Sequence, residues 1–372
     1  MKILYGVQGT GNGHITRARV MAQAFQQRNL KVDYLFSGRP AYEYYDMEVF
    51  GGYRCCPGLS FSINQGSVQY LQTLREAKPL QFLRDRKTLN LRDYDLVITD
   101  FEPITAWAAK RSGVPSLGLG HQYAFHYDIP KAGNNPVAAA IMRCFAPADY
   151  KLGLHWHPFN APLLPPIIAS GQDLPDNEAD PGAILVYLPV EAQGQVIRLL
   201  QHWPQYRFNL FTNDFPAGSY QNVRIHRQSR EGFQRHLLGC AGVICNAGFE
   251  LVSEALSQGK KLLVRPLARQ MEQLSNAAAL QQLDLAHTMT QLSAEKIEQW
   301  LHSGRAVQVR YPNVAKRLTE WICNGDWDNP LTLAGQLWEQ TESPQYPDRF
   351  FEIEAGGNYL KRFKHEFIVT SY

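Results

Sequence analysis

The sequence lacks the apolar runs and cysteine patterns that mark several classes of protein. No uninterrupted apolar stretch approaches the about 20 residues of a membrane-spanning helix, and the run after Lys2 is too short for a signal peptide. None of the six cysteines has CxxC spacing, and Cys55 and Cys56 are adjacent, where an ordinary disulfide is not expected. We therefore expect reduced thiols in a cytoplasmic protein, either soluble or peripheral at the inner face of the membrane.

The chain also has little net positive charge. The chain has 37 Lys and Arg against 34 Asp and Glu, a net charge of +3, and these cations form no stripe that would neutralise a nucleic-acid backbone. Nucleic acid is therefore not an expected partner. A basic and aromatic cluster, "LKRFKHEF" at residues 360–367, is either a solvated tail or a contact with an anionic membrane surface.

The chain is long enough for two domains and has the pattern of an α/β protein. At 372 residues it exceeds one ordinary core, since domains average roughly 150 residues. Short β-branched runs alternate with amphipathic segments, which predicts two Rossmann-like, doubly wound parallel sheets. The predicted parts are an N-terminal domain over 1–160, a linker over 161–181, a C-terminal domain over 182–325, and a helix and tail over 326–372.

Individual elements are predicted from the same alternation. Ile15, Ala18, Ala22 and Phe25 fall at helical spacing and predict a crossover helix with one buried face. A helix at 331–340 is expected to pack back on the first domain. The expected strands are 2–7, 31–36, 94–99, 114–120, 183–189, 207–212, 223–226, 242–246 and 261–266.

A glycine-rich loop, "GTGNGH", follows the first predicted strand at residues 9–14. Glycines at that position let a ligand approach the backbone and the next helix N-terminus, so Gly11 and Gly13 are candidate donor-binding residues. The dinucleotide fingerprint GxGxxG requires a third glycine where this chain has His14. Two alternatives stay open: a turn without a ligand, and an NADP site in which Arg39 meets the 2′-phosphate.

His14 suits a general base better than a phosphate cradle, because an imidazole titrates near neutral pH. Asp100 follows another predicted strand, and the carboxyl ends of parallel strands meet at one edge of a sheet. An aspartate there can fix the histidine tautomer and stabilise the imidazolium. The alternative for Asp100 is an N-cap of the helix expected from Glu102.

The second half contains the stretch "NAGFELVSEALSQGKKLLVRPLARQMEQLSNAAAL", residues 246–280, which reads as strand end, glycine turn, helix, strand, loop and helix. Gly248 opens the helix and Gly259 ends it. Glu250 and Glu254 lie four residues apart on one helical face, where like charges are unfavourable unless a group donates to them. A ribose diol and plain solvation are the two explanations.

These motifs resemble the two-domain GT-B nucleotide-sugar glycosyltransferases, which include the lipid II N-acetylglucosaminyltransferase and the UDP-sugar transferases. The 246–280 stretch looks like their donor signature, "GTGNGHITRA" is similar to their first loop, and "YDLVITDFEPITAWAAKRSGVPSLGLG" to a further motif. The resemblance covers about residues 1 to 310 and points to a little-characterised bacterial and archaeal branch. It implies two domains that face a central cleft.

Roles for single residues follow from the resemblance. It implies that His14 is the base and Asp100 its partner. Glu254 would hold the ribose, Glu272 and Gln273 the sugar hydroxyls, and Asn276 would support their loop.

The sequence departs from the family where relatives contact the diphosphate through His, Ser or Thr. It has Asn246 and Glu250 in that region, which leaves the backbone near Gly248 and Arg265 or Arg269 as diphosphate contacts. A carboxylate at 250 would repel a diphosphate unless it points away.

The predicted function is metal-independent, inverting transfer of a sugar from a nucleoside-diphosphate donor, expected to be UDP-linked, to a saccharide or lipid-linked hydroxyl acceptor, without a cofactor. The alternatives are a nucleotide-sugar epimerase, a non-catalytic nucleotide-binding protein and an NADP-dependent oxidoreductase. The aromatic stretch with Tyr42, Tyr44 and Tyr45 either contacts the acceptor or fills a core edge. Neither His155 with His157 nor "DWD" at 326–328 makes a convincing metal site.

Overall fold

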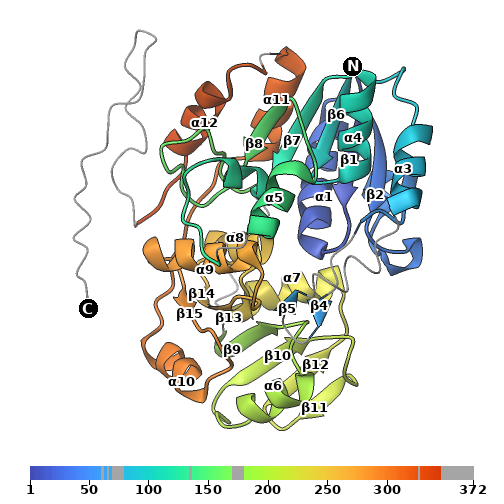
Figure 1. The fold of residues 1–372 in the computed structure, drawn as a ribbon. Helices are drawn as coiled ribbons and strands as arrows, with labels where there is room; N and C mark the ends of the chain where they lie inside the picture. The colour runs from blue at the N-terminus through green and yellow to red at the C-terminus, as the bar shows by residue number, and fades with distance from the viewer. Residues whose placement is uncertain are drawn as a thin grey trace.

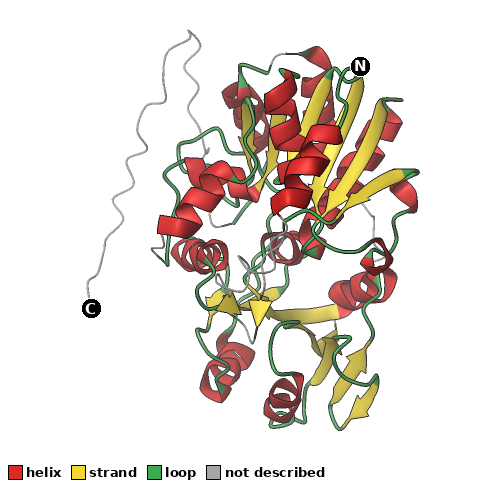
Figure 2. Ribbon diagram, turned by 45° about the vertical axis from the view of Figure 1, so that its right-hand side comes forward, coloured by secondary structure: helices red, strands yellow, loops and turns green. Residues whose placement is uncertain are grey.

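The computed structural model describes residues 1–59, 63–64, 67–68, 79–133, 136–169, 180–325 and 327–344. Its two halves each contain a sheet flanked by helices, as the sequence predicted (Figures 1 and 2). The basic cluster at 360–367, part of the predicted linker and Asp326 of the "DWD" motif lie outside the described residues.

The first sheet is entirely parallel and has the order β3-β2-β1-β6-β7-β8. Alternate residues of β1 face different layers: Ile3 and Tyr5 pack with the helix α1, and Leu4 with α4. A sheet covered on both faces needs continuous apolar strands, which is why these runs could be predicted. The strands are β1 Lys2–Gln8, β2 Lys31–Ser37, β3 Tyr53–Cys56, β6 Leu96–Asp100, β7 Ser116–Gly120 and β8 Tyr150–Gly153.

The predicted apolar stripe of the first crossover helix is buried, with Ile15, Ala18, Ala22 and Phe25 at most 1% exposed. The helix begins at Asn12, directly after its N-cap Gly11, so that it includes His14. The helices of this half are α1 Asn12–Gln27, α3 Pro79–Thr88, α4 Pro103–Ser112 and α5 Pro136–Cys144, with short 3-10 helices η1 Ala41–Glu43, η2 Glu48–Phe50 and η3 His121–His126.

The second sheet has the order β11-β12-β10-β9-β13-β14-β15, parallel except for the edge strand β11. Its strands are β9 Asp180–Tyr187, β10 Arg207–Phe211, β11 Gly218–Tyr220, β12 Val223–His226, β13 Cys240–Asn246, β14 Lys261–Arg265 and β15 His287–Thr288. Its helices are α6 Gln193–Leu200, α7 Arg230–Gly239, α8 Phe249–Ser257, α9 Met271–Gln282 and α10 Ala294–Ser303. A separate two-stranded ribbon pairs β4 Ile63–Asn64 with β5 Ser67–Val68.

The last two helices, α11 Val314–Asn324 and α12 Pro330–Glu339, return to the first half, where Figure 1 shows them beside its sheet. The Trp338 indole N–H donates to the Leu163 carbonyl at 2.7 Å, and Arg28, the C-cap of α1, pairs with Glu320 of α11 at 2.5 Å. The predicted packing of the helix at 331–340 on the first domain is therefore confirmed. Residues 161–169 of the predicted linker are mostly buried, and Leu164 bridges to Leu154 beside β8.

Candidate active site

A cavity of about 600 Å³ lies between the two halves and is lined by residues of both. The carboxyl ends of β1 and β6 open toward it from the first sheet, and the N-terminus of α8 does so from the second half. Nine of the predicted site residues line it, namely Gly11, Gly13, His14, Asn246, Gly248, Glu250, Glu254, Glu272 and Gln273. Asp100, Arg265 and Asn276 are not among its lining residues.

His14 and Asp100 are in contact at the floor of the cavity. His14 lies in the first turn of α1, and its Nδ1 is 2.6 Å from Oδ1 of Asp100, the last residue of β6. Since a carboxylate only accepts, Nδ1 carries the proton and Nε2 keeps its lone pair on the cavity side, 3.5 Å from the Gln122 amide nitrogen. The pair therefore has the geometry of a general base and the group that orients it.

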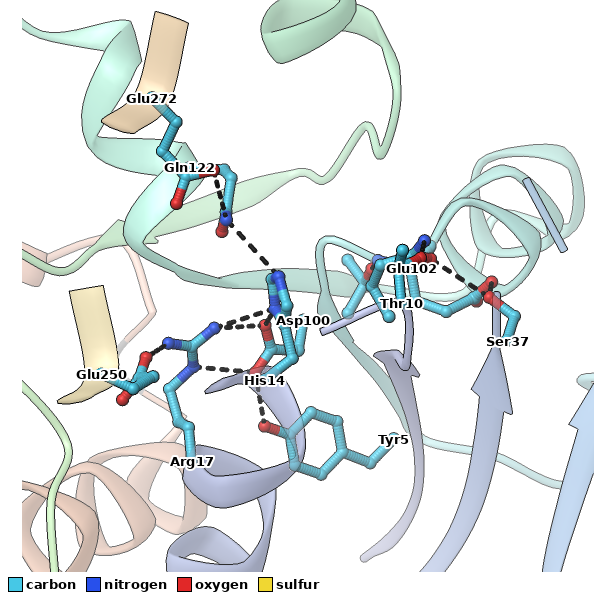
Figure 3. Close-up of polar contacts among 12 residues, drawn as sticks. Tyr5, Thr10, His14, Arg17, Ser37, Asp100, Glu102, Gln122, Glu250 and Glu272 are labelled. Carbon is cyan, nitrogen blue, oxygen red and sulfur yellow. Dashed lines mark hydrogen bonds and ion pairs between the residues drawn. The ribbon is translucent and has the colours of Figure 1, made fainter. Parts of the chain in front are cut away.

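Asp100 is fully buried and accepts from several donors (Figure 3). Arg17 Nε donates to its Oδ2 at 2.8 Å and Arg17 Nη2 to its Oδ1 at 2.5 Å, while the Tyr5 hydroxyl lies 3.3 Å from Oδ2. Burial opposes its charge, but the Arg17 guanidinium and His14 outweigh burial and hold the pKa of Asp100 below its usual value. The carboxylate is therefore ionised at neutral pH.

The alternative role of Asp100 as a helix N-cap is wrong. Glu102 is the N-cap of α4, and its carboxylate accepts from the backbone N–H groups of Ile104 at 2.9 Å and Thr105 at 2.7 Å. The helix begins at Pro103 rather than at Glu102, because proline needs no N–H partner in the first turn. Asp100 is thus left to His14 and Arg17.

The glycines of the first loop serve different purposes. A Cβ at Gly9 would come within 2.1 Å of the Tyr44 hydroxyl, and one at Gly13 within 2.9 Å of Glu250 Cγ in the other half. A Cβ on Gly11, in contrast, meets nothing within 4 Å, although Gly11 lines the cavity. Gly9 and Gly13 therefore permit close packing, and Gly11 leaves the backbone at the N-terminus of α1 open to the cavity.

The loop between β13 and α8 forms the facing wall. Gly248 is the N-cap of α8 without a side-chain cap, so the first N–H groups of this helix are open to the cavity. Asn246 donates through Nδ2 to the Arg265 carbonyl at 3.0 Å, and the Arg265 guanidinium is paired with Glu191. Glu250 of α8 points across to the first half, where its Oε1 is ion-paired with Arg17.

Glu254 lies one turn further along α8 and also lines the cavity. Burial raises the pKa of Glu254 to about 7, and the Gln234 amide at 3.1 Å and Arg230 oppose that shift only in part. A hydroxyl pair that donates to this carboxylate would favour its ionised form. Glu254 is therefore an acceptor whose charge depends on what fills the cavity.

The residues predicted around the sugar come from α9. Glu272 Oε2 accepts from the Gln122 amide at 3.2 Å, and Gln273 Oε1 accepts from the Leu267 N–H at 3.0 Å, which fixes the loop before the helix. Asn276 is 1% exposed and connects the Ala247 carbonyl, at 2.9 Å, with His121 of the first half, at 2.6 Å. Asn276 thus holds the β13–α8 loop from behind the cavity.

The family is established by comparison with known proteins. The model for glycosyl transferase family 1 matches residues 1–303 of the chain. The chain belongs to this family. The protein is therefore a glycosyltransferase, and its two parallel-sheet domains have the GT-B fold. No curated protein matches the chain.

Solved glycosyltransferases share the fold at low identity. The glycosyltransferase of kitacinnamycin has a TM-score of 0.56 at 14% identity, over 90% of this chain and 95% of that one. The spinosyn forosaminyltransferase SpnP has a TM-score of 0.53 at 12% identity, over 91% and 98%. The spinosyn rhamnosyltransferase SpnG has a TM-score of 0.51 at 14% identity, over 91% and 96%. Identities this low establish the fold alone.

Sequence reasoning missed three parts of the glycosyltransferase site. Arg17 lies three residues after His14 on α1, so helical spacing could have placed it on the same face. Gln122, the second residue after β7, reaches both His14 and Glu272, but nothing in the sequence marks it. The third part is an apolar wall from the β6–α4 turn and around α5, formed by Phe101, Ala138, Ile141, Met142 and Phe145.

The remaining candidate residues are the tyrosines of the aromatic stretch, the possible metal ligands and the cysteines, and most of them lie outside the site. Tyr42 is 84% exposed, Tyr44 is buried in contact with Phe36, and Tyr45 lines the cavity. Tyr44 therefore fills a core edge, and contact of the aromatic stretch with the acceptor stays a prediction. Within the described parts of the chain, no group of three His, Cys, Asp or Glu residues is placed to hold a metal ion. His155 is buried beside His121, and all six cysteines are unpaired.

Proposed function

We propose that the glycosyltransferase is inverting and metal-independent, that its donor is a nucleoside-diphosphate sugar, expected to be UDP-linked, and that no cofactor takes part. The observation that supports this best is the placement of two groups on opposite walls of one cavity. His14 Nε2 has its lone pair on one wall, and the uncapped N-terminus of α8 lies on the other. The first can take a proton, and the second can meet a developing negative charge.

The reaction follows from these positions. The acceptor oxygen attacks the anomeric carbon and forms a new C–O bond as its proton passes to His14 Nε2. The bond between the anomeric carbon and the diphosphate breaks, and the nucleoside diphosphate leaves with the electron pair. Attack from the face opposite the leaving group inverts the anomeric centre. Asp100 stabilises the imidazolium, and the N–H groups after Gly248 stabilise the leaving diphosphate.

Donor recognition is assigned to the second half. Glu254 accepts from the ribose hydroxyls, and Glu272 and Gln273 contact the sugar. Asn246 and the backbone at Gly248 lie at the diphosphate, as does Gly11 from the facing loop. Arg265 is assigned no contact with the diphosphate, because it does not line the cavity and its charge is offset by the ion pair with Glu191.

The acceptor is proposed to be a saccharide or lipid-linked hydroxyl compound that carries an apolar group. The apolar wall around α5 supports this, because Phe101, Ile141 and Phe145 line the cavity that holds His14. A lipid-linked acceptor would require peripheral contact with a membrane at the cytoplasmic face. No helix in the described residues has the length and apolarity to cross a bilayer.

The test uses the full chain with UDP-, GDP- and TDP-linked sugars, chelator, and hydroxyl acceptors with and without apolar groups. We expect acceptor-dependent transfer from one donor, product of inverted anomeric configuration by NMR, no loss with chelator, and abolition by His14→Ala with donor binding retained. Conversion of the donor without any acceptor would instead identify an epimerase. Retained transfer by His14→Ala would overturn the base assignment.

A further inference from the structure

We propose that Glu250, although it belongs to the donor half, sets the basicity of His14 through Arg17 and is a positioning residue for proton transfer rather than a ligand of the donor. This inference rests on the proposed role of His14 as the base. It concerns a chain of four side chains, His14, Asp100, Arg17 and Glu250, which we call the charge chain (Figure 3).

The contacts of the charge chain are continuous across the domain boundary. His14 Nδ1 and Arg17 Nη2 share Asp100 Oδ1, at 2.6 and 2.5 Å, and the two nitrogens are 3.1 Å apart. Arg17 Nη1 then donates to Glu250 Oε1. Arg17 is 1% exposed and Asp100 0%, so water screens these charges little.

Charge alternation along this chain determines how well His14 holds a proton. With only Arg17 beside it, the charge of Asp100 would be neutralised, and a proton on His14 would leave one net buried positive charge. Glu250 neutralises Arg17 instead, so the three groups sum to one negative charge, and the imidazolium brings the sum to zero. Low dielectric makes the balanced state much more favourable than the unbalanced one.

The fold keeps Glu250 in this position. Gly13 leaves room for it, since a Cβ there would lie 2.9 Å from Glu250 Cγ. Helix α8 itself is anchored to the first half, because the Trp156 indole donates to Ser253 Oγ at 2.8 Å and His121 stacks on Phe249 with ring centroids 4.2 Å apart. Oε1 of Glu250 is thereby held against Arg17.

Other polar or charged groups face His14 from the neighbouring elements. They are Gln122 from η3, Glu272 from α9 through Gln122, and Tyr5 from β1 through Asp100. Among them only Glu272 is a further carboxylate. It makes no hydrogen bond or ion pair with Arg17 in the described residues, but its negative charge also favours the charged form of Arg17. Removal of Glu250 therefore changes the charge chain and leaves Glu272 as it is.

The test compares Glu250→Gln with a matched control, Glu320→Gln. Both substitutions remove a glutamate that pairs with an arginine, but Glu320 pairs with Arg28, the C-cap of α1, at the far end of that helix from His14. Histidine-labelled protein is titrated by NMR, and His14 is assigned by the signal missing from His14→Gln. We expect His14 to bind its proton about tenfold more weakly in Glu250→Gln, at the low end of single-charge effects, and unchanged in Glu320→Gln.

Kinetics give a second readout. In Glu250→Gln the acid limb of the pH profile should move to lower pH and kcat should fall about tenfold, while the donor KM stays near that of the wild type. Glu250→Asp retains the charge at a greater distance and should shift both readouts in the same direction by less, even if Glu250→Gln does not fold. A His14 titration that is identical in the wild type and the folded Glu250 variants would overturn the proposal, as would a rise in donor KM without a kcat change.

The two proposals fail separately. The NMR titration needs no turnover, so it tests the charge chain even if no sugar is ever transferred. If His14→Ala remains active, the base assignment is wrong, whatever the titration shows. If His14→Ala is inactive and the titration does not respond to Glu250, the base assignment holds and the charge chain is rejected.

Discussion

Two helices that begin at the cavity, α1 and α8, differ from three helices on the outside in how they begin. Helices α1 and α8 have glycine N-caps, Gly11 and Gly248, without a side-chain hydrogen bond, and a Cβ at either would meet nothing within 4 Å. Helices α10, α11 and α12 are capped by the side chains of Ser293, Asn313 and Asn329. At α1 and α8 the open N–H groups are thus kept where a ligand is expected, whereas α7 begins at the same cavity and is capped by the side chain of Ser229.

The first sheet contains both arrangements within three residues. Asp100 ends β6 and serves His14, whereas Glu102 closes the N-terminus of α4 and also accepts from the Ser37 hydroxyl at 2.7 Å. Both carboxylates are fully buried. One belongs to the site and the other to the helix, which makes them a matched pair for experiment.

The largest effect is expected from that pair. Asp100→Asn should lower kcat by about 10³-fold or more, because the amide neither stabilises the imidazolium nor fixes its tautomer, while donor affinity stays similar. Glu102→Ala should cost roughly 1–2 kcal/mol of stability through the lost cap and leave most of the activity in the folded fraction. Equal kcat losses in the two folded variants, measured by steady-state kinetics, would erase the distinction between them.

A smaller effect is expected at the open end of α8. Gly248→Ala adds a methyl group that touches no protein atom within 4 Å, so the fold should tolerate it. The methyl group should obstruct the diphosphate and weaken donor binding about tenfold, since ligands at such termini approach the backbone closely. Calorimetric titration with nucleoside diphosphate measures this. Undiminished affinity would mean that the α8 terminus does not bind the donor.

The raised pKa of Glu254, one turn further along α8, predicts that the stability of the protein depends on pH. Its folded pKa of about 7 exceeds the usual 4.5, so the neutral form is favoured in the folded state, and its contribution to stability is lost as pH rises through 7. The melting temperature of the wild type should therefore fall between pH 5 and pH 8.5 relative to that of Glu254→Gln. Bound ribose should reverse the preference and release a proton near pH 7, visible as a buffer-dependent binding enthalpy that Glu254→Gln lacks.

The smallest effect is expected on the outside. Asn313→Ala removes the cap of α11. In the wild type, Asn313 Oδ1 accepts from the Lys316 N–H at 2.9 Å and so caps the helix N-terminus. The expected loss is about 1 kcal/mol of unfolding free energy with no change in transfer. Chemical denaturation measures the first and steady-state kinetics the second. A drop in kcat for this variant would show that outer caps also support the site.

Much of the fold could be predicted because the strands are buried on both faces. The centres of these strands, such as 96–98 and 243–245, are apolar and buried, and the stripe of α1 repeats at helical spacing. His14 and Asp100 could be paired because both follow parallel strands, whose carboxyl ends share an edge. These are local patterns joined by one general rule of topology.

The rest depended on contacts between distant parts of the chain. Arg17 could have been placed beside His14, but its bond to Glu250 spans 233 residues and has no local signature. The same holds for Gln122, which reaches Glu272 in the other half. The need for glycine at position 13 likewise becomes visible only once Glu250 is seen against it.

The return of α11 and α12 to the first half has a consequence for biosynthesis. Trp338 binds the carbonyl of Leu163, and α11 covers the outer face of α1 through contacts that include Arg28 with Glu320. The ribosome synthesises these helices after the whole donor half. The N-terminal half therefore emerges first, but it can complete its packing only when α11 and α12 have been made. Until then the apolar residues of the first half that α11 and α12 cover stay exposed, so we expect nascent chains stalled before residue 314 to aggregate or to recruit a chaperone.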